Sequence, residues 1–229
     1  MALYAIGDLH LSFGADKPMD VFGGRWVGYV DKLRQGLSVI EPTDTTVLLG
    51  DLSWALDLEH AREDFAFISA IPGRKIILKG NHDYWWSTAA KFYRFCQENA
   101  FADMFVLNNN CYQYGDVALC GTRGWFYEED RQGTHDEKIF RRELGRLEAS
   151  LKAAGEREKL CFLHYPPKYT GYECPEILQM LQSYGVRACY YGHLHAESLR
   201  MAFQGACQDV DYHLVSADYV NFTPVRVLD

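Results

Sequence analysis

The chain has 229 residues, of which 48% are hydrophobic and 24% charged, and its formal net charge is −8 at pH 7. This composition is typical of a globular protein with a substantial core, and the sequence shows no low-complexity tract or internal repeat. The acidic charge argues against extended nucleic-acid binding, which needs a basic face. It leaves room for a small phosphorylated substrate, because metal ions could supply local positive charge.

Signals for membrane insertion or secretion are not evident in the sequence. The N-terminus, MALYAIGDLH, has no basic segment followed by a long apolar run, so a secretory signal is not expected. No apolar run approaches the roughly 18 residues that a membrane span needs. The seven cysteines include no C-x-x-C pair, and several lie in strand-like runs, as expected of buried thiols in a reducing compartment. We therefore predict a cytoplasmic protein that does not contact membranes.

Strand-like and helix-like segments alternate through the first half of the chain. Short apolar runs that end in Gly-Asp or Gly-Asn cover 2–8, 45–51 and 74–83, and they predict strands. Between them, the apolar spacing of 25–40 and 56–71 predicts helices. This order indicates β-α-β-α-β with parallel strands.

The second half contains more strand. The runs on either side of the turn at 108–110 predict an antiparallel section, and helices are expected at 135–153 and 175–184. Because no Pro/Gly/Ser-rich linker interrupts the chain, residues 1–229 are expected to form a single α/β domain. Further strands are expected in KLCFLH and RACYYGH and near 198–204, 210–216 and 224–228.

The polar residues of interest lie where the predicted strands end. In open α/β sheets, ligands bind beyond the carboxyl ends of the strands, so these groups are expected to share one crevice. Carboxylates, imidazoles and an amide oxygen suit divalent Mn, Fe, Zn or Ni. They are too many for one tetrahedral zinc, and two ions that share a bridging carboxylate are the more natural use. The residues are Asp8, His10, Asp51, Asn81, His82, Asp83, His164, His193 and His195.

Each motif taken alone has an ordinary explanation. D-x-H is common in polar turns, Gly-Asp is common at helix caps, and a histidine before two prolines is usually packed. Two imidazoles two residues apart on an extended chain do share one face. The order D-x-H, G-D, G-N-H-D, H and G-H-x-H, each after a predicted strand, favours a metal site over coincidence.

In this order the motifs resemble the five blocks of the calcineurin-like metallophosphoesterase superfamily, over residues 8–195. Within it, the chain is similar to small bacterial predicted phosphohydrolases. The resemblance implies a four-layer αββα sandwich of two mixed β-sheets flanked by helices. It also implies hydrolysis of a phosphomonoester or phosphodiester, by in-line attack of a hydroxide that bridges two metal ions.

The resemblance assigns seven ligands to two divalent ions, among which manganese is favoured. The ligands are Asp8, His10 and His195 for the first ion, Asp51 as the bridge, and Asn81, His164 and His193 for the second. His82 matches no ligand position and corresponds to the general acid or hydrogen-bond donor at the leaving oxygen. An imidazole that titrates near neutrality suits that role.

One position departs from the family pattern. Protein phosphatases of this superfamily carry an aspartate three residues after the bridging aspartate, and it orients the catalytic histidine. Trp54 occupies that position here, which weakens the case for a protein phosphatase. His82 is then left to lean on Asp83, on a backbone carbonyl or on nothing. Asp83 itself is expected to support the ligands without binding metal.

The aromatic run after the G-N-H-D motif is expected to open a helix at the site. Among Tyr84, Trp85 and Trp86, at least one ring is expected in the core and one in the substrate pocket. The segments 127–137 and 168–173 are either lids or ordinary loops.

Arg123 lies in a glycine-flanked loop, where its guanidinium could bind a phosphate bidentately or simply be exposed. A small phosphorylated substrate is the expected partner, and the oligomeric state stays open. The competing hypothesis is a non-catalytic interaction scaffold on the same fold. The retromer subunit with a phosphoesterase fold is its precedent, although that protein has lost part of the ligand set.

Overall fold

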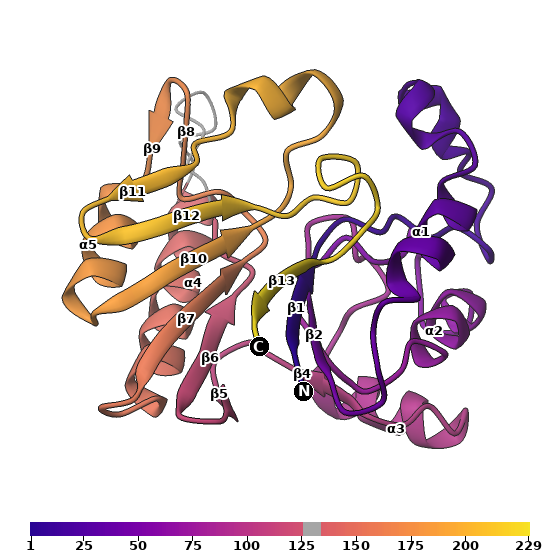
Figure 1. Ribbon diagram of the computed structural model, residues 1–229, viewed down its shortest axis with the longest axis horizontal. Coiled ribbons are helices and arrows are strands. Elements are labelled where there is room, and N and C mark those ends of the chain that lie inside the picture. The colour runs from indigo at the N-terminus through magenta and orange to yellow at the C-terminus, as the bar shows by residue number, and fades with distance from the viewer. Residues whose placement is uncertain (126–133) are drawn as a thin grey trace. The chain divides into compact units, whose positions relative to one another are not determined.

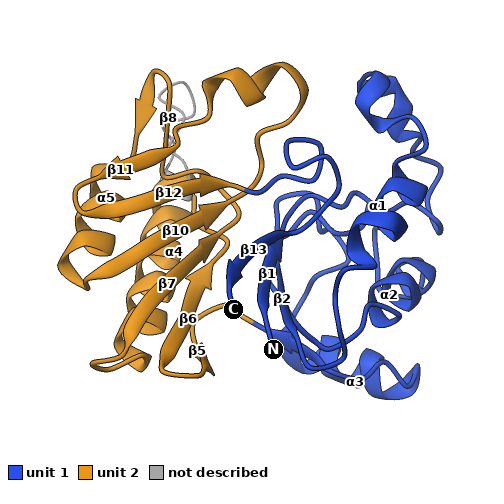
Figure 2. Cartoon of the chain, viewed as in Figure 1, with its two compact units in different colours: residues 1–106, 215–229 blue, residues 107–214 orange. Residues whose placement is uncertain are grey.

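A computed structural model describes residues 1–125 and 134–229 of the chain, with side chains from 136 onward in the second range (Figure 1). The chain divides into two compact units: unit 1 comprises 1–106 and 215–229, and unit 2 comprises 107–214 (Figure 2). The prediction of a single domain over 1–229 stays a prediction. Most of the segment 127–137 lies outside the described residues.

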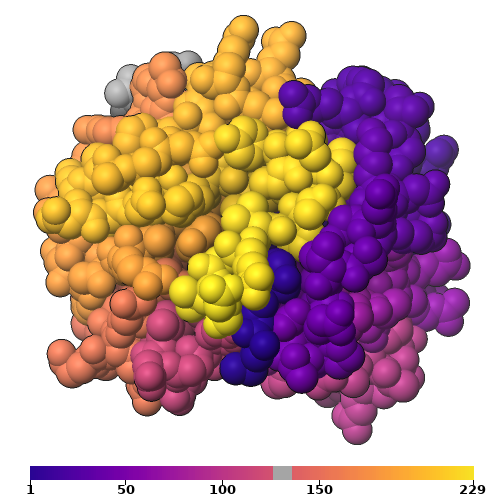
Figure 3. All heavy atoms as spheres, in the orientation of Figure 1, coloured from indigo at the N-terminus to yellow at the C-terminus, as the bar shows by residue number. Residues whose placement is uncertain are grey.

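Unit 1 is built on a five-stranded mixed sheet with three helices on one face (Figure 1). Four of its strands are parallel, as the sequence predicts, and the C-terminal strand joins antiparallel to the first. In Figure 3 the atoms of the two chain ends accordingly lie side by side. In sheet order the strands are β13 (Val225–Leu228), β1 (Leu3–Ile6), β2 (Thr45–Leu48), β3 (Arg74–Ile77) and β4 (Met104–Val106); the helices are α1 (Tyr29–Leu37), α2 (Arg62–Ser69) and α3 (Ala89–Glu98).

The helix-covered face of this sheet carries a row of apolar side chains in register. Alternate strand residues point to the same face, so pairing the parallel strands aligns their last residues across the sheet. Each such side chain contributes roughly 1.5–3 kcal/mol when fully buried. The row comprises Ile6, Leu48, Ile77 and Val106, and it packs with Leu33, Phe65 and Phe92 of the helices. The strands therefore end level with one another, which positions the residues that follow.

The helix predicted to open at Tyr84, Trp85 and Trp86 begins later, and that prediction is wrong. Helix α3 starts at Ala89, after a turn that contains the three rings. The reason is Thr88, whose hydroxyl oxygen accepts a hydrogen bond from the amide of Lys91 at 3.2 Å and caps the helix.

The helices predicted at 25–40 and 56–71 are also shorter than expected. Two short 3-10 helices (Met19–Phe22 and Gly24–Trp26) come first, and Gly28, the left-handed N-cap with φ of 64°, starts α1 only at Tyr29. Ahead of α2, the side chain of Asp57 accepts a hydrogen bond from the amide of His60 at 2.9 Å and holds a turn instead.

Unit 2 is built on a six-stranded mixed sheet with two helices on one face (Figure 1). The predicted antiparallel section is confirmed for the run after the turn at 108–110, which pairs with the next strand. It is wrong for the run before that turn, which is β4 of unit 1 and runs parallel to β3. Four neighbouring strands of unit 2 run parallel. In sheet order the strands are β11 (Gly205–Cys207), β12 (Val210–Leu214), β10 (Val186–Tyr191), β7 (Glu158–Leu163), β6 (Val117–Thr122) and β5 (Cys111–Tyr114); the helices are α4 (Thr134–Ala153) and α5 (Pro175–Ser183), and β8 (Lys168–Tyr169) and β9 (Tyr172–Glu173) form a separate hairpin.

The strand expected at 198–204 is wrong. Residues Ala196–Met201 form a 3-10 helix instead, because Ser198 caps its first turn against His195, and β11 follows only at Gly205–Cys207. The buried cysteines expected in strands are confirmed at Cys120, Cys161 and Cys189, which lie in the core under α4 and α5.

The fold class is confirmed: the chain is an α/β protein with two mixed sheets, each flanked by helices. Among the residues described, no helix combines the length and apolar character needed to cross a membrane.

Candidate metal centre

In unit 1, three neighbouring strands deliver candidate ligands to one edge of the sheet. Past the ends of β1 and β2, the amide of Asp8 donates to the carbonyl of Gly50 at 2.9 Å, and the amide of His10 donates to the carbonyl of Asp51 at 2.9 Å. The two ligand loops thus stay paired beyond the sheet. Asn81 follows β3, the next strand in the sheet.

The backbone of these loops is left-handed at the candidate ligands themselves. Asp8, His10 and Asp51 have φ values of 61°, 47° and 50°. Residues other than glycine rarely adopt this region, and each such position costs about 1–3 kcal/mol. Strain of this kind concentrates at functional sites, because the surrounding structure must hold it in place.

Two glycines let the second and third loops approach more closely than any other residue would. A Cβ atom at Gly80 would lie 2.0 Å from Oδ1 of Asp51, and one at Gly50 would lie 2.5 Å from the amide nitrogen of Gly80. Gly50 also has a φ of 85°. The G-D and G-N-H-D motifs therefore need their glycines for contact with each other.

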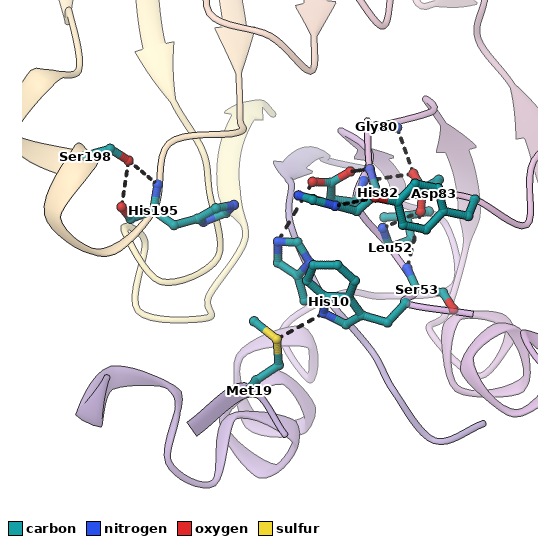
Figure 4. A network of polar contacts seen from close by, with 12 residues as sticks. His10, Met19, Leu52, Ser53, Gly80, His82, Asp83, His195 and Ser198 are labelled. Atoms are coloured by element: carbon teal, nitrogen blue, oxygen red, sulfur yellow. Dashed lines mark hydrogen bonds and ion pairs between the residues drawn. The ribbon is translucent and has the colours of Figure 1, made fainter. Parts of the chain in front are cut away.

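Asp83 joins these loops through its side chain (Figure 4). Its carboxylate is fully buried and accepts hydrogen bonds from five N–H groups. Bonds of this kind to an ionised carboxylate are among the stronger ones in proteins. The donors are the amides of Gly80 (2.7 Å), Asp51 (2.8 Å), Leu52 (2.8 Å) and Ser53 (3.3 Å) and the indole N–H of Trp85 (2.9 Å).

The carboxylates of the candidate ligands are buried next to an imidazole. Oδ1 of Asp51 accepts from the amide of His82 at 2.8 Å, and its Oδ2 lies 4.0 Å from Nε2 of His10. Asp8, His10 and Asp51 are at most 3% exposed. Gathering buried carboxylates in one place is costly unless a cation balances them. This donor set of carboxylate and imidazole fits a divalent metal ion.

His82 lies between two aromatic side chains rather than beside an aspartate at position 54. The Trp54 ring lies 4.5 Å from the His82 ring, centroid to centroid, and it also stacks on His10 at 5.0 Å with a 21° angle between planes. Nδ1 of His82 is 3.3 Å from the hydroxyl of Tyr84. At position 54, where the protein phosphatases carry an aspartate, this chain therefore places an indole ring against the imidazole.

The three rings of the aromatic run have different environments. Trp85 is buried in the core of unit 1, where its indole N–H donates to Asp83. Trp86 is half-buried against the same core, and Tyr84 is 55% exposed beside His82. Tyr84 is therefore the most exposed of the three rings.

In unit 2, the candidate ligands also follow neighbouring parallel strands. The amide of His164 donates to the carbonyl of Arg123 at 3.1 Å, and the carbonyl of His164 accepts from the amide of Gly192 at 3.1 Å. The rings of His164 and His193 are 5.2 Å apart, and His193 has a φ of 73°. His195 is fixed by Ser198, whose hydroxyl accepts from its amide and donates to its carbonyl (Figure 4).

Arg123 is mostly buried and belongs to an ion cluster in unit 2. Its Nη2 lies 3.4 Å from Oε1 of Glu143, which is 2% exposed and also accepts from Thr122 (3.0 Å) and Arg146 (2.5 Å). The guanidinium lies 4.8 Å from the centre of the Trp125 ring. The alternative of a freely exposed surface arginine is therefore wrong, whereas phosphate binding by Arg123 stays a prediction.

The sequence analysis missed two buried carboxylates that form hydrogen bonds to the loops of the candidate site. Glu143 lies on α4 and Asp64 on α2, and both are buried polar side chains within helices. Asp64 accepts from the amide of Phe13 at 2.8 Å and from the hydroxyl of Ser53. A carboxylate on the apolar face of an amphipathic helix was the available signal.

The fold and the residues at its strand ends define a class: α/β proteins that carry candidate metal-binding groups of aspartate and histidine. The chain belongs to the calcineurin-like phosphoesterase family, whose model matches residues 1–197. The resemblance read from the five motifs is thereby confirmed.

Solved structures of low sequence identity share the fold. The phosphopantetheinyl hydrolase PptH from Mycobacterium tuberculosis has a TM-score of 0.59 at 13% identity, covering 99% of this chain and 95% of that one. AQ665 from Aquifex aeolicus, a protein of unknown function, has 0.53 at 16% identity, covering 98% and 95%. TT1561 from Thermus thermophilus has 0.54 at 12%, covering 84% and 81%. No curated protein matches the chain.

Proposed function

We propose that this protein is a phosphoesterase that binds two divalent metal ions and hydrolyses a small phosphomonoester or phosphodiester. The observation that carries the proposal is the group of buried, left-handed ligands Asp8, His10 and Asp51 in a member of this family. A purely structural turn has no need to keep two carboxylates and an imidazole in strained backbone.

The residues that would hold the ions fall in both units. In unit 1 they are Asp8, His10, Asp51 and Asn81, and in unit 2 they are His164, His193 and His195. Bound divalent ions supply a nucleophile at neutral pH and neutralise charge on the phosphoryl oxygens. Manganese is the favoured metal of the proposal, and Fe, Zn and Ni suit the same donors.

His82 is the residue that we assign to the leaving group. Its Nδ1 lies beside the Tyr84 hydroxyl, so its Nε2 is the nitrogen that would donate a proton to the departing oxygen. The packing of the imidazole against Trp54 fixes the plane of the ring. A positioned proton donor of this kind contributes typically about 10²–10⁴-fold to the rate.

The substrate of the proposal is small and soluble, and the location is cytoplasmic. The net charge of −8 disfavours a polyanionic nucleic acid. The similarity to the phosphopantetheinyl hydrolase supports the phosphoesterase fold, and its 13% identity gives no guide to the substrate.

The test combines a substrate screen with two substitutions. The protein, loaded in turn with Mn, Fe, Zn and Ni, would be assayed on phosphomonoesters, cyclic nucleotides and phosphodiesters. Asp51→Asn is expected to lose bound metal and activity together, and His82→Ala to keep metal and lose activity. Asp116→Asn, in the exposed β5–β6 turn, is the matched control and is expected to behave as wild type.

Two results would count against the proposal. Equal hydrolysis of an aryl phosphate by wild type, Asp51→Asn and His82→Ala would place the activity elsewhere. Purified protein that neither contains metal nor gains activity with added manganese would favour the interaction scaffold.

A further inference from the structure

The loop that follows the D-x-H motif is anchored along its length within unit 1. The amide of Leu11 donates to the carbonyl of Leu52 at 2.9 Å, and the amide of Phe13 donates to Asp64 at 2.8 Å. Gly14 packs closely against the turn that precedes α2, since a Cβ atom at Gly14 would be 1.9 Å from the carbonyl oxygen of His60. The indole N–H of Trp54 donates to the sulfur of Met19 at 3.0 Å (Figure 4).

This anchored loop places a cation next to the aromatic support of His82. The ammonium of Lys17 lies 4.6 Å from the centre of the Trp54 ring and 5.8 Å from that of Phe22. The same indole ring also contacts His82, at 4.5 Å between ring centroids. The ammonium of Lys17 and the imidazole that we assign to the leaving group therefore share Trp54 as a neighbour.

Within the described part of the chain, Lys17 forms no ion pair, and its ammonium contacts the two rings. Lys17 as a residue is half-buried, and an ammonium that contacts only rings keeps its hydrogen-bonding protons for another acceptor. Lys152 and Lys168, in contrast, each form an ion pair with a glutamate. Its free donors suit an anionic oxygen.

We propose that Lys17 binds an anionic group on the leaving-group side of the substrate, so that the substrate is a phosphoester whose leaving group carries a second anion, either a carboxylate or another phosphate. This inference rests on the proposed phosphoesterase function and on the placement of His82 at the leaving oxygen. Trp54 then has two roles, since it packs His82 and holds the Lys17 ammonium in place.

The experiment uses two probes that differ in one charge: 3-carboxyphenyl phosphate and its methyl ester. Wild type, Lys17→Met and Lys17→Arg would be assayed as full-length, metal-loaded protein, with KM and kcat measured separately for each probe. Lys17→Met keeps the aliphatic packing on Trp54, and Lys17→Arg keeps the charge. Lys91→Met, an exposed lysine on α3, is the matched control.

Wild type is expected to show a KM about ten-fold lower for the carboxylate probe than for the ester, because an ion-paired hydrogen bond has that order of effect. Lys17→Met should abolish the difference, Lys17→Arg should keep most of it, and added salt should reduce it. A third probe, 3-phosphonophenyl phosphate, replaces the carboxylate by a phosphonate. Comparing its KM with that of the carboxylate probe shows which of the two anions Lys17 prefers.

Four results would overturn the inference. The KM ratio could stay unchanged in Lys17→Met, which would leave the lysine a packing role only. Lys17→Met could instead raise KM equally for both probes, which would place the ammonium at the transferred phosphate. If wild type hydrolyses both probes without preferring the anionic one, the inference fails while the proposed function stands; if it hydrolyses neither with any metal, both fail.

Discussion

The two units hold their candidate ligands by different means. In unit 1, side-chain carboxylates join the loops in addition to the backbone bonds between them, since Asp83 accepts five N–H groups and Asp64 joins residues 13 and 53. In unit 2, the loop of His164 is held by backbone bonds to Arg123 and Gly192, and that of His195 by one serine hydroxyl.

This difference predicts where the protein is sensitive to substitution. A buried carboxylate that serves several donors concentrates their free energy in two atoms, and its loss leaves every donor unsatisfied at once. Backbone hydrogen bonds do not depend on side-chain identity. A loop that is held by main-chain bonds is therefore less sensitive to substitution. Side chains of unit 1 should therefore give the larger effects.

The largest expected effect is that of Asp83→Asn. The amide keeps one acceptor oxygen and presents an NH₂ group to N–H donors, so several buried amides lose their acceptor. We expect a loss of about 3 kcal/mol in the free energy of unfolding, measured by urea denaturation, with loss of bound metal. Asp116→Asn should change neither. Wild-type stability in Asp83→Asn would show that the backbone alone holds the loops of unit 1.

Gly80→Ala tests whether the close approach of the unit 1 loops matters for the site. The added Cβ would lie 2.0 Å from Oδ1 of Asp51, so that carboxylate must move. A displacement of about 1 Å at a reacting centre costs on the order of 100-fold in rate, which kcat/KM on an aryl phosphate would reveal.

Gly145→Ala is the matched control for that substitution, because a Cβ atom there meets nothing within 4 Å and the residue lies on α4. It should leave kcat/KM unchanged and stabilise the helix by about 0.5–1 kcal/mol. Equal activity in the two variants would contradict the role given to Gly80.

Glu143→Gln is the corresponding test in unit 2. Glutamine can keep the bond to Thr122 but loses the charge that pairs with Arg123 and Arg146. A destabilisation of about 2 kcal/mol is expected in urea denaturation. Glu158→Gln breaks an exposed pair with Arg187 and should cost no more than about 1 kcal/mol. Equal losses in the two would mean that burial of the Glu143 cluster has no energetic consequence.

Ser198→Ala should have a smaller effect than Glu143→Gln. The hydroxyl caps the 3-10 helix against His195 through bonds of 2.8 and 2.6 Å, and loss of such a cap costs about 1 kcal/mol. Thermal unfolding measures this loss, with Ser183→Ala at the exposed end of α5 as the control. A loss as large as that of Asp83→Asn would reverse the order of sensitivity between the units.

The sequence predicts the fold class and the strand-end positions well because both depend on local signals. Short apolar runs ending in Gly-Asp or Gly-Asn specify parallel strands, and the register of Ile6, Leu48 and Ile77 brings the residues after them to one edge. The helix boundaries at 84–88 and 25–28 were missed because single residues decided them, namely the cap of Thr88 and the left-handed Gly28.

The supporting network could not be predicted for a different reason. Asp64 accepts a hydrogen bond from Phe13, which is 51 positions away in the sequence. Glu143 accepts one from Thr122, at a separation of 21 positions. No local period encodes such a partner. The contact between Lys17 and Trp54 likewise depends on how the chain folds, since the two residues lie in different loops.

The smallest expected effect separates two buried carboxylates within unit 1. Burial raises the pKa of Asp64, against the opposing hydrogen bonds from Ser53 and Phe13. The pKa of Asp44 is lowered, first by the hydrogen bond from the amide of Glu41 and also by that from Ala2. The two should therefore contribute to stability with opposite dependence on pH.

The folded state keeps the proton of Asp64 to a higher pH than the unfolded chain does. Its contribution to stability falls as pH rises from the unfolded pKa, about 3.9, through the raised folded pKa. For Asp44, the contribution is fully present above about pH 3.9 and is lost as pH falls through the lowered folded pKa.

Urea denaturation of wild type, Asp64→Asn and Asp44→Asn between about pH 3 and 7 measures both contributions. The stability of wild type relative to Asp64→Asn should fall with rising pH, and relative to Asp44→Asn it should rise. If both stability differences rose with pH, Asp64 would, like Asp44, be stabilised as an anion in the folded state. Its burial would then not raise its pKa.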